Sequence, residues 1–166
     1  MKAITIHQPW ATLIALGEKR FETRSWATKY RGPIAIHASK KDPRLMMRSL
    51  PHDISTNAFD RLYTKLGVKS GALARLATRS VIATANLTEC YKVHIDHSGD
   101  AVLMVGNVPK VWIGEGSNEY EFGWYEEGRY AWELTNVKLL DKPIPAKGQQ
   151  GLWNWHYGKD DKELLP

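Results

Sequence analysis

Three residues near the N-terminus have types and a spacing that suit binding of an anion or a nucleotide. Lys19, Glu22 and Arg24 follow one another closely, directly after Gly17. A lysine binds phosphate as a point charge, whereas the planar guanidinium of an arginine can form two parallel hydrogen bonds. Glu22 and Arg24 share one face of an alternating segment, so Glu22 can hold that guanidinium or accept from a base or ribose. We expect Lys19, Glu22 and Arg24 to converge on one solvent-accessible cleft; an exposed ion pair of little energetic value is the alternative.

Aromatic side chains are interleaved with these cations. Trp10 precedes the charged segment, Trp26 and Tyr30 follow it, and Arg31 comes next. Rings alternating with cations are typical of surfaces that stack the bases of single-stranded nucleic acid. We expect a salt-sensitive binding surface that contains Gln8, Trp10, Trp26, Tyr30 and Arg31 as well as the three charged residues. Core packing is the alternative for Trp10, which lies on an apolar helical stripe.

Short elements must position these side chains. Residues 3–6 predict a strand, and Pro9 suits the first turn of a helix that Gly17 ends. Residues 20–26 alternate as a second strand, with Glu22, Arg24 and Trp26 on one face and Thr23 and Ser25 on the other.

The rest of the chain predicts further strands and a helical insertion. Strands are expected at 34–38, 79–93 and 130–140, and helices across about 42–78, with a cap at Asp42 and breaks at Pro51 and near Gly67. Residues 94–123 are expected to form a loop-rich excursion with one short strand at 102–105. Strands at both chain ends with helices between them indicate an α+β, barrel-like domain over residues 1–166.

Composition narrows the class of protein. The 166 residues carry a net charge of +5, with cations concentrated in the N-terminal third and glutamates gathered around 115–127. The one cysteine, Cys90, excludes an intrachain disulfide, and no apolar run approaches a membrane span, so we expect a cytoplasmic protein without membrane contact. Cys90, His94 and His97 match no zinc-binding spacing, so no metal and no other cofactor is expected. No feature of the sequence sets an oligomeric state.

Several ordered motifs resemble the ASCH (activating signal cointegrator homology) family. The family signature is G-x-K-x-x-E-x-R, and residues 17–24 match each fixed position. The flanking segments 6–11, 30–32 and 36–38 also agree, and 122–124, 128–132 and 143–148 resemble its larger members. The resemblance implies a PUA-like β-barrel with flanking helices, with the signature residues lining a cleft.

The resemblance also implies a function. Family members are thought to bind RNA or DNA, so we expect a nucleic-acid or nucleotide-binding module, with RNA as the favoured ligand and a nucleotide-like small molecule as another. A hydrolase acting on RNA or a modified nucleoside, with Lys19 and Glu22 as its catalytic pair, is the first alternative; a protein-interaction domain is the second. Small members that hydrolyse acylated nucleosides carry a threonine nucleophile where this chain has Glu22. We therefore expect that this protein is not an enzyme of that kind.

Overall fold

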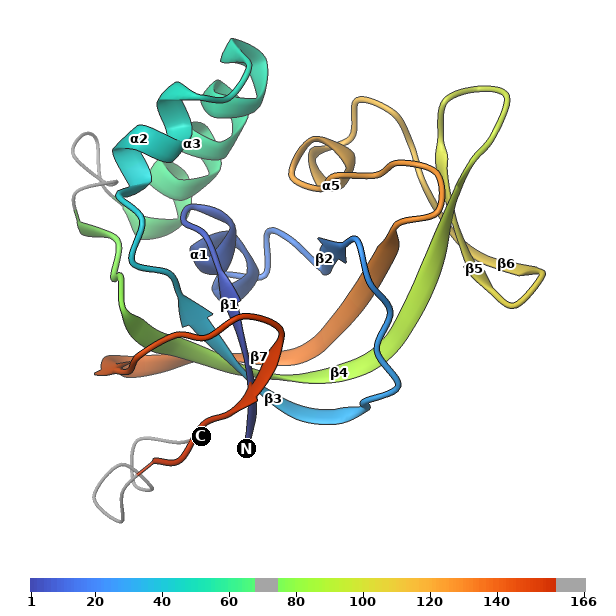
Figure 1. The fold of residues 1–166 in the computed structure, drawn as a ribbon. Coiled ribbons are helices and arrows are strands. Elements are labelled where there is room, and N and C mark those ends of the chain that lie inside the picture. Colours follow the sequence, from blue (N-terminus) through green and yellow to red (C-terminus); the bar gives the residue numbers. More distant parts are fainter. Residues whose placement is uncertain (68–74, 158–166) are drawn as a thin grey trace.

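The computed structural model describes residues 1–67 and 75–157, and its strands form one mixed sheet (Figure 1). The strands pair in the order β2-β7-β4-β3-β1-β8, and β5 and β6 extend the sheet from the far end of β4. Their bounds are β1 Lys2–Ile6, β2 Phe21–Arg24, β3 Gly32–Ala38, β4 Ser80–Ile95, β5 Ala101–Val105, β6 Val108–Ile113, β7 Tyr130–Pro145 and β8 Leu152–Asn154. The helices are α1 Trp10–Ala15, α2 Pro43–Arg48, α3 His52–Leu66 and α5 Asn118–Glu121.

The sheet curves strongly around α1. β4 and β7 are the two longest strands, and their pairing is interrupted by three register shifts, which bend a sheet and increase its twist. Figure 1 shows both strands sweeping beneath α1. Ala11, Ile14 and Ala15 of α1 are buried in a core with β1, β3, β4 and β7, because one helical face carries all three.

The predicted barrel is not formed. β2 and β8 end the sheet and do not pair with one another, so the sheet is open. Both end strands are short, with four and three residues, and β2 pairs only with β7. The apolar concave face is covered by α1 instead of by further strands, so burial of the core does not require closure. The α+β class is confirmed.

The segment from α1 to β2 forms as the sequence predicts. Gly17 has a φ of 76°, a conformation that glycine adopts without a steric penalty, and it ends the helix. The backbone N–H groups of Glu18 and Lys19 then donate to the carbonyl of Leu13, at 2.8 and 3.2 Å. This tight turn directs the chain into β2.

Two predicted regions differ from the structure. The insertion contains α2, capped by Asp42 as expected, and α3, which ends at Gly67; residues 77–80 are not helical, and 68–74 lie outside the described residues. The excursion contains the expected short strand as β5, and adds β6, which forms a hairpin with it, and α5. Within the described residues, no helix has the length and apolarity needed to span a membrane.

Candidate functional site

A cleft of about 660 Å³ opens where β1, β2, the α2–α3 pair and the segment after α5 come together. Its polar and aromatic lining comes from segments far apart in the sequence. Thr5 lies in β1 and His7 directly follows it, Trp10 begins α1, and the helical insertion contributes Met46, Leu50 and Ile54. The remaining lining residues are Ile6, the run 22–26, the run 121–124 and Arg129.

Glu22 and Arg24 form an ion pair inside this cleft. The Nε atom of Arg24 lies 3.0 Å from Oε1 of Glu22, without hydrogen-bond alignment, and Nη2 donates to the carbonyl of Thr5 at 2.8 Å. Glu22 is buried, whereas the Arg24 side chain is about a quarter exposed. The shared face of the two residues predicts this contact. The arrangement fixes a partly exposed guanidinium at the cleft wall.

Lys19 does not join them, which corrects the expected convergence. Its residue is 2% exposed and lies outside the cleft lining, with Nζ 3.5 Å from Oε1 of Glu119 in α5. Glu119 also accepts from the N–H groups of Arg20 and Phe21 and from the Tyr125 hydroxyl. The ammonium of Lys19 can be buried because the half-buried carboxylate of Glu119 offers it a charged partner. Lys19 therefore holds the start of β2 to α5.

Trp124 and Arg129 form a second cationic element in the cleft. Neither residue was predicted from the sequence to belong to the site. Trp124 is 59% exposed, and the guanidinium carbon of Arg129 lies 4.3 Å from its ring centroid. Nε of Arg129 donates to the Trp124 carbonyl at 3.0 Å, and among the described residues the guanidinium has no carboxylate partner. Their place in the segments 122–124 and 128–132, which resemble the larger ASCH members, was the available signal.

β2 contributes both of its faces to the cleft, whereas strict alternation predicts one. Thr23 and Ser25 line it together with Glu22 and Arg24. The hydroxyl oxygen of Thr23 accepts from the Trp124 N–H at 2.8 Å and so ties the second cationic element to β2. Because β2 is a four-residue edge strand, a ligand can reach it from the side as well as from one face.

Trp26 and Trp10 supply half-buried aromatic walls. Trp26 lies edge-on to the buried Trp132, with ring centroids 4.6 Å apart and an interplanar angle of 89°. Trp10 packs against two apolar clusters, so the core-packing alternative holds for part of its ring while another part lines the cleft. Rings fixed in this way are suited to stack a planar ligand without loss of side-chain freedom.

His7 lies at the same cleft and is biased toward the neutral form. Its Nδ1 is 2.7 Å from the Ser39 hydroxyl. Burial, followed by the nearby positive charges of Lys41 and Arg24, lowers the pKa of the imidazole. A neutral imidazole can donate and accept hydrogen bonds, so His7 is suited to contact a ligand without adding charge.

A match to a family profile shows which family the chain belongs to. The ASCH domain profile matches residues 4–144, which is most of the chain. The protein belongs to the ASCH family. A segment of 40 residues is 50% identical to activating signal cointegrator 1 of Homo sapiens and equally to that of Mus musculus. That segment is 24% of this chain and 7% of each relative, so the similarity concerns a small part of those proteins.

The ASCH signature thus has two roles in this chain. Gly17 and Lys19 build the turn and its link to α5, while Glu22 and Arg24 reach the cleft. Spacing alone does not distinguish structural positions from ligand-facing ones. It therefore predicts, wrongly, that Lys19 shares the cleft with Glu22 and Arg24.

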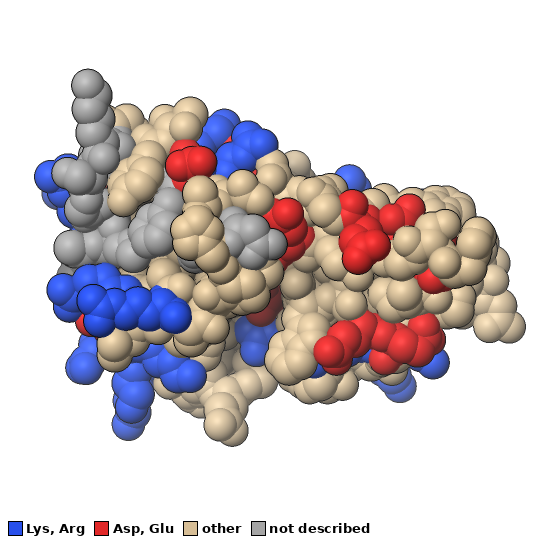
Figure 2. Space-filling model, turned by 90° about the horizontal axis from the view of Figure 1, so that it is seen from above, with Lys and Arg blue, Asp and Glu red and all other residues tan. Residues whose placement is uncertain are grey.

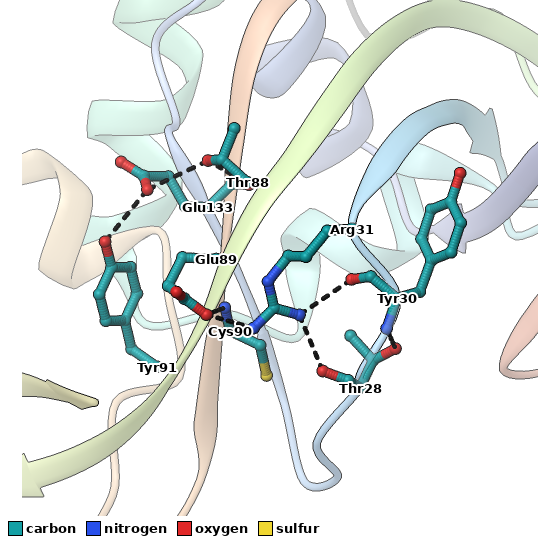
Figure 3. Close-up of polar contacts among 8 residues, drawn as sticks. All are labelled: Thr28, Tyr30, Arg31, Thr88, Glu89, Cys90, Tyr91 and Glu133. Atoms are coloured by element: carbon teal, nitrogen blue, oxygen red, sulfur yellow. Dashed lines mark hydrogen bonds and ion pairs between the residues drawn. The ribbon is translucent and has the colours of Figure 1, made fainter. Parts of the chain in front are cut away.

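Besides Lys19, three expected site residues lie outside the cleft lining. Gln8 is fully buried, where its amide donates to the Ala77 carbonyl at 2.8 Å and its Oε1 caps α1 at Thr12. Figure 3 shows Arg31 between Glu89 on β4 and the carbonyls of Thr28 and Tyr30. Tyr30 donates from its hydroxyl to the Pro33 carbonyl. These contacts satisfy the polar groups of Tyr30 and Arg31 within the protein.

Proposed function

We propose that this ASCH domain binds single-stranded nucleic acid, with RNA as the favoured ligand, and holds one nucleotide in the cleft. The observation that carries the proposal is the pairing, in one cleft, of the Arg24 guanidinium with the stacked Arg129–Trp124 element. The cleft volume falls within the range of small-molecule sites, about 300–1,000 Å³. A base would stack on the indole rings while a phosphate contacts the guanidinium groups.

The groups on β2 add the hydrogen-bonding capacity that a nucleoside requires. Glu22 offers a carboxylate, and Thr23 and Ser25 offer hydroxyls, all along one cleft wall. A ribose 2′-hydroxyl both donates and accepts hydrogen bonds, so these side chains suit RNA. We also propose that the open sheet is a variant of the PUA-type RNA-binding domain, as the family resemblance implies.

The arrangement favours binding over the hydrolase alternative. A hydrolase using Lys19 and Glu22 needs both groups at the substrate, yet the lysine ammonium lies buried beside Glu119 and Glu22 is paired with Arg24. The hydrolase alternative is tested by asking whether the purified protein hydrolyses N4-acylcytidine. Hydrolysis that disappears in Lys19→Ala would support that alternative.

The test is fluorescence anisotropy with a labelled single-stranded RNA of about eight nucleotides. Trp124→Ala removes a stacking surface and should weaken binding about 5-fold to 150-fold, because one stacked base contributes about 1–3 kcal/mol. Arg129→Ala should weaken binding and reduce the slope of log K against log salt by about 0.7, the value for one phosphate contact on a single strand.

The matched control is Lys110→Ala, which removes an exposed cation from β6, away from the cleft. It should leave the affinity near that of the unaltered protein. Equal losses in Arg129→Ala and Lys110→Ala would show that binding follows net charge alone. The protein-interaction alternative predicts another result: an affinity that does not depend on salt and that Trp112→Ala abolishes. Trp112 is a large exposed apolar residue of β6.

A further inference from the structure

A second, smaller hollow borders the start of α2, whereas the cleft borders Met46 later in the same helix. Its volume is about 330 Å³, and three of its lining residues are cations. The only acid among them, Asp42, is already engaged, because it caps α2 through the Arg44 N–H and pairs with the Arg44 guanidinium, both at 2.8 Å. The lining residues are Lys40, Asp42, Pro43, Arg44, Leu76, Thr78 and Arg79.

Two of its cations are free to bind a ligand. Lys40 and Arg79 are exposed, and within residues 1–67 and 75–157 neither side chain has a hydrogen-bond or ion-pair partner. Arg79 also adopts a left-handed backbone with a φ of 54°, which is unusual for a residue with a side chain. Backbone strain of this kind persists where the surrounding structure enforces it and is concentrated at functional sites.

The hollow and the cleft are joined through one compact junction. The backbone N–H of Arg79 donates a hydrogen bond to the carbonyl of Ser39, at 3.4 Å. The hydroxyl of the same serine contacts the His7 imidazole. The Gln8 amide donates to Ala77, beside Thr78 of the hollow. Burial is the main cause of the lowered pKa of His7, and the charges of Lys41 and Arg24 add to it, so both cations lie near this imidazole.

The charge distribution of the surface agrees with this path. Figure 2 shows lysine and arginine side chains gathered mainly on the side of α2 and α3, and acidic side chains gathered toward the β5–β6 hairpin.

We propose that the hollow binds a backbone phosphate of the same strand whose nucleotide occupies the cleft. Lys40 and Arg79 contact the phosphate oxygens, while Arg44 is held at the site by Asp42. The ligand is then an oligonucleotide of about four nucleotides or more, and a mononucleotide occupies only half of the site. This inference rests on the proposed function of the cleft.

The experiment compares affinity across ligand length. Dissociation constants are measured for a nucleoside monophosphate and for single-stranded RNA of about two, four and eight nucleotides. The test variant is Lys40→Ala/Arg79→Gly, in which glycine accepts the left-handed backbone at position 79. Lys110→Ala is the charge control, Arg129→Ala is the cleft control, and melting temperatures confirm that each variant is folded.

The unaltered protein should bind the four-nucleotide RNA at least tenfold more tightly than the monophosphate. The double variant should lose about tenfold in affinity for the longer RNAs, with a salt slope lower by about 1.4, and should bind the monophosphate normally. Arg129→Ala should weaken every ligand. Unchanged affinity of the double variant for long RNA, or an equal loss for the monophosphate, would overturn the second site while leaving the cleft intact. Failure of the unaltered protein to bind any of these ligands would overturn both proposals.

Discussion

At the scale of single residues, Glu119 is the side chain on which the geometry of β2 depends most. It joins the Lys19 ammonium, two backbone N–H groups and the Tyr125 hydroxyl. Glu119→Ala would leave a buried ammonium without its carboxylate, so we expect the free energy of unfolding to fall by about 3 kcal/mol. Urea denaturation measures the loss.

A double-mutant cycle separates this ion pair from the rest of the Glu119 contacts. Because Lys19→Met removes the ammonium that Glu119→Ala leaves unpaired, the double variant should be less destabilised than the sum of the two single variants. Strict additivity would mean that Lys19 and Glu119 do not interact.

His37 gives the protein a built-in sensitivity to acid. Its Nε2 donates to the Ala146 carbonyl at 3.0 Å, while its buried Nδ1 has no partner among the described residues. Burial lowers the pKa of the imidazole, although the bond to Ala146 opposes that change. The unfolded chain therefore binds the proton first as pH falls, and stability should drop below about pH 6.5.

The measurement is the change in unfolding free energy between about pH 7.5 and about pH 5.5. His37→Gln keeps a donor for Ala146 and removes the titrating group, so its loss of stability should be smaller than that of the unaltered chain. His7 titrates in the same direction, so part of the loss should remain. Identical pH profiles for the two proteins would contradict this role of His37.

At the scale of elements, the segment between α5 and β7 carries the stacked Arg129–Trp124 pair. A Cβ at Gly123 would lie 2.2 Å from the ring of Tyr125, which is itself buried and bonded to Glu119. Gly123→Ala should therefore displace Trp124, cost about 1–3 kcal/mol in stability and weaken RNA binding. Thermal melting and anisotropy follow the two effects.

Gly106→Ala is the matched control for that substitution. Gly106 has a positive φ of 58° and open space around it, so alanine there costs about 1 kcal/mol or slightly more without any steric contact. Its RNA affinity should be unchanged, because the β5–β6 turn lies away from the cleft. A normal affinity for Gly123→Ala would show that the segment does not position the ligand.

Local signals predicted the elements that depend on local interactions. Pro9 and Gly17 marked α1, and alternation marked β2, because caps and strand faces are set by neighbours in the sequence. The strand expected at 102–105 is β5, whereas its hairpin partner β6 was not predicted although Gly106-Asn107 is a turn signal. β6 is an edge strand, where Pro109 is tolerated.

Residues whose positions depend on contacts with distant parts of the sequence were not predicted correctly. Lys19 was predicted to lie in the cleft. Its actual partner, Glu119, lies a hundred positions later in the sequence, and no local pattern links the two. Gln8, Tyr30 and Arg31 have the residue types of ligand-binding groups but satisfy contacts within the protein. Glu22 and Arg24 were predicted together, because residues two apart on a strand share a face.

At the scale of the whole molecule, the proposed function requires that RNA enter one cleft, although large aromatic residues are also exposed elsewhere, as Trp112 is. The seven indole N–H groups report on this directly, because the tryptophans are spread across the molecule. Trp10, Trp26 and Trp124 line the cleft, whereas Trp112 is 57% exposed on β6 and does not line it.

The most direct test is an NMR titration of the indole N–H resonances with single-stranded RNA of about eight nucleotides. If RNA binds in the cleft, the indole N–H resonances of Trp124 and Trp26 should shift strongly. The resonance of Trp10 should shift less, and that of Trp112 should not shift. Arg129→Ala should reduce the shifts at a given RNA concentration. Shifts confined to Trp112, with the cleft indoles unchanged, would contradict the claim that this cleft binds nucleic acid.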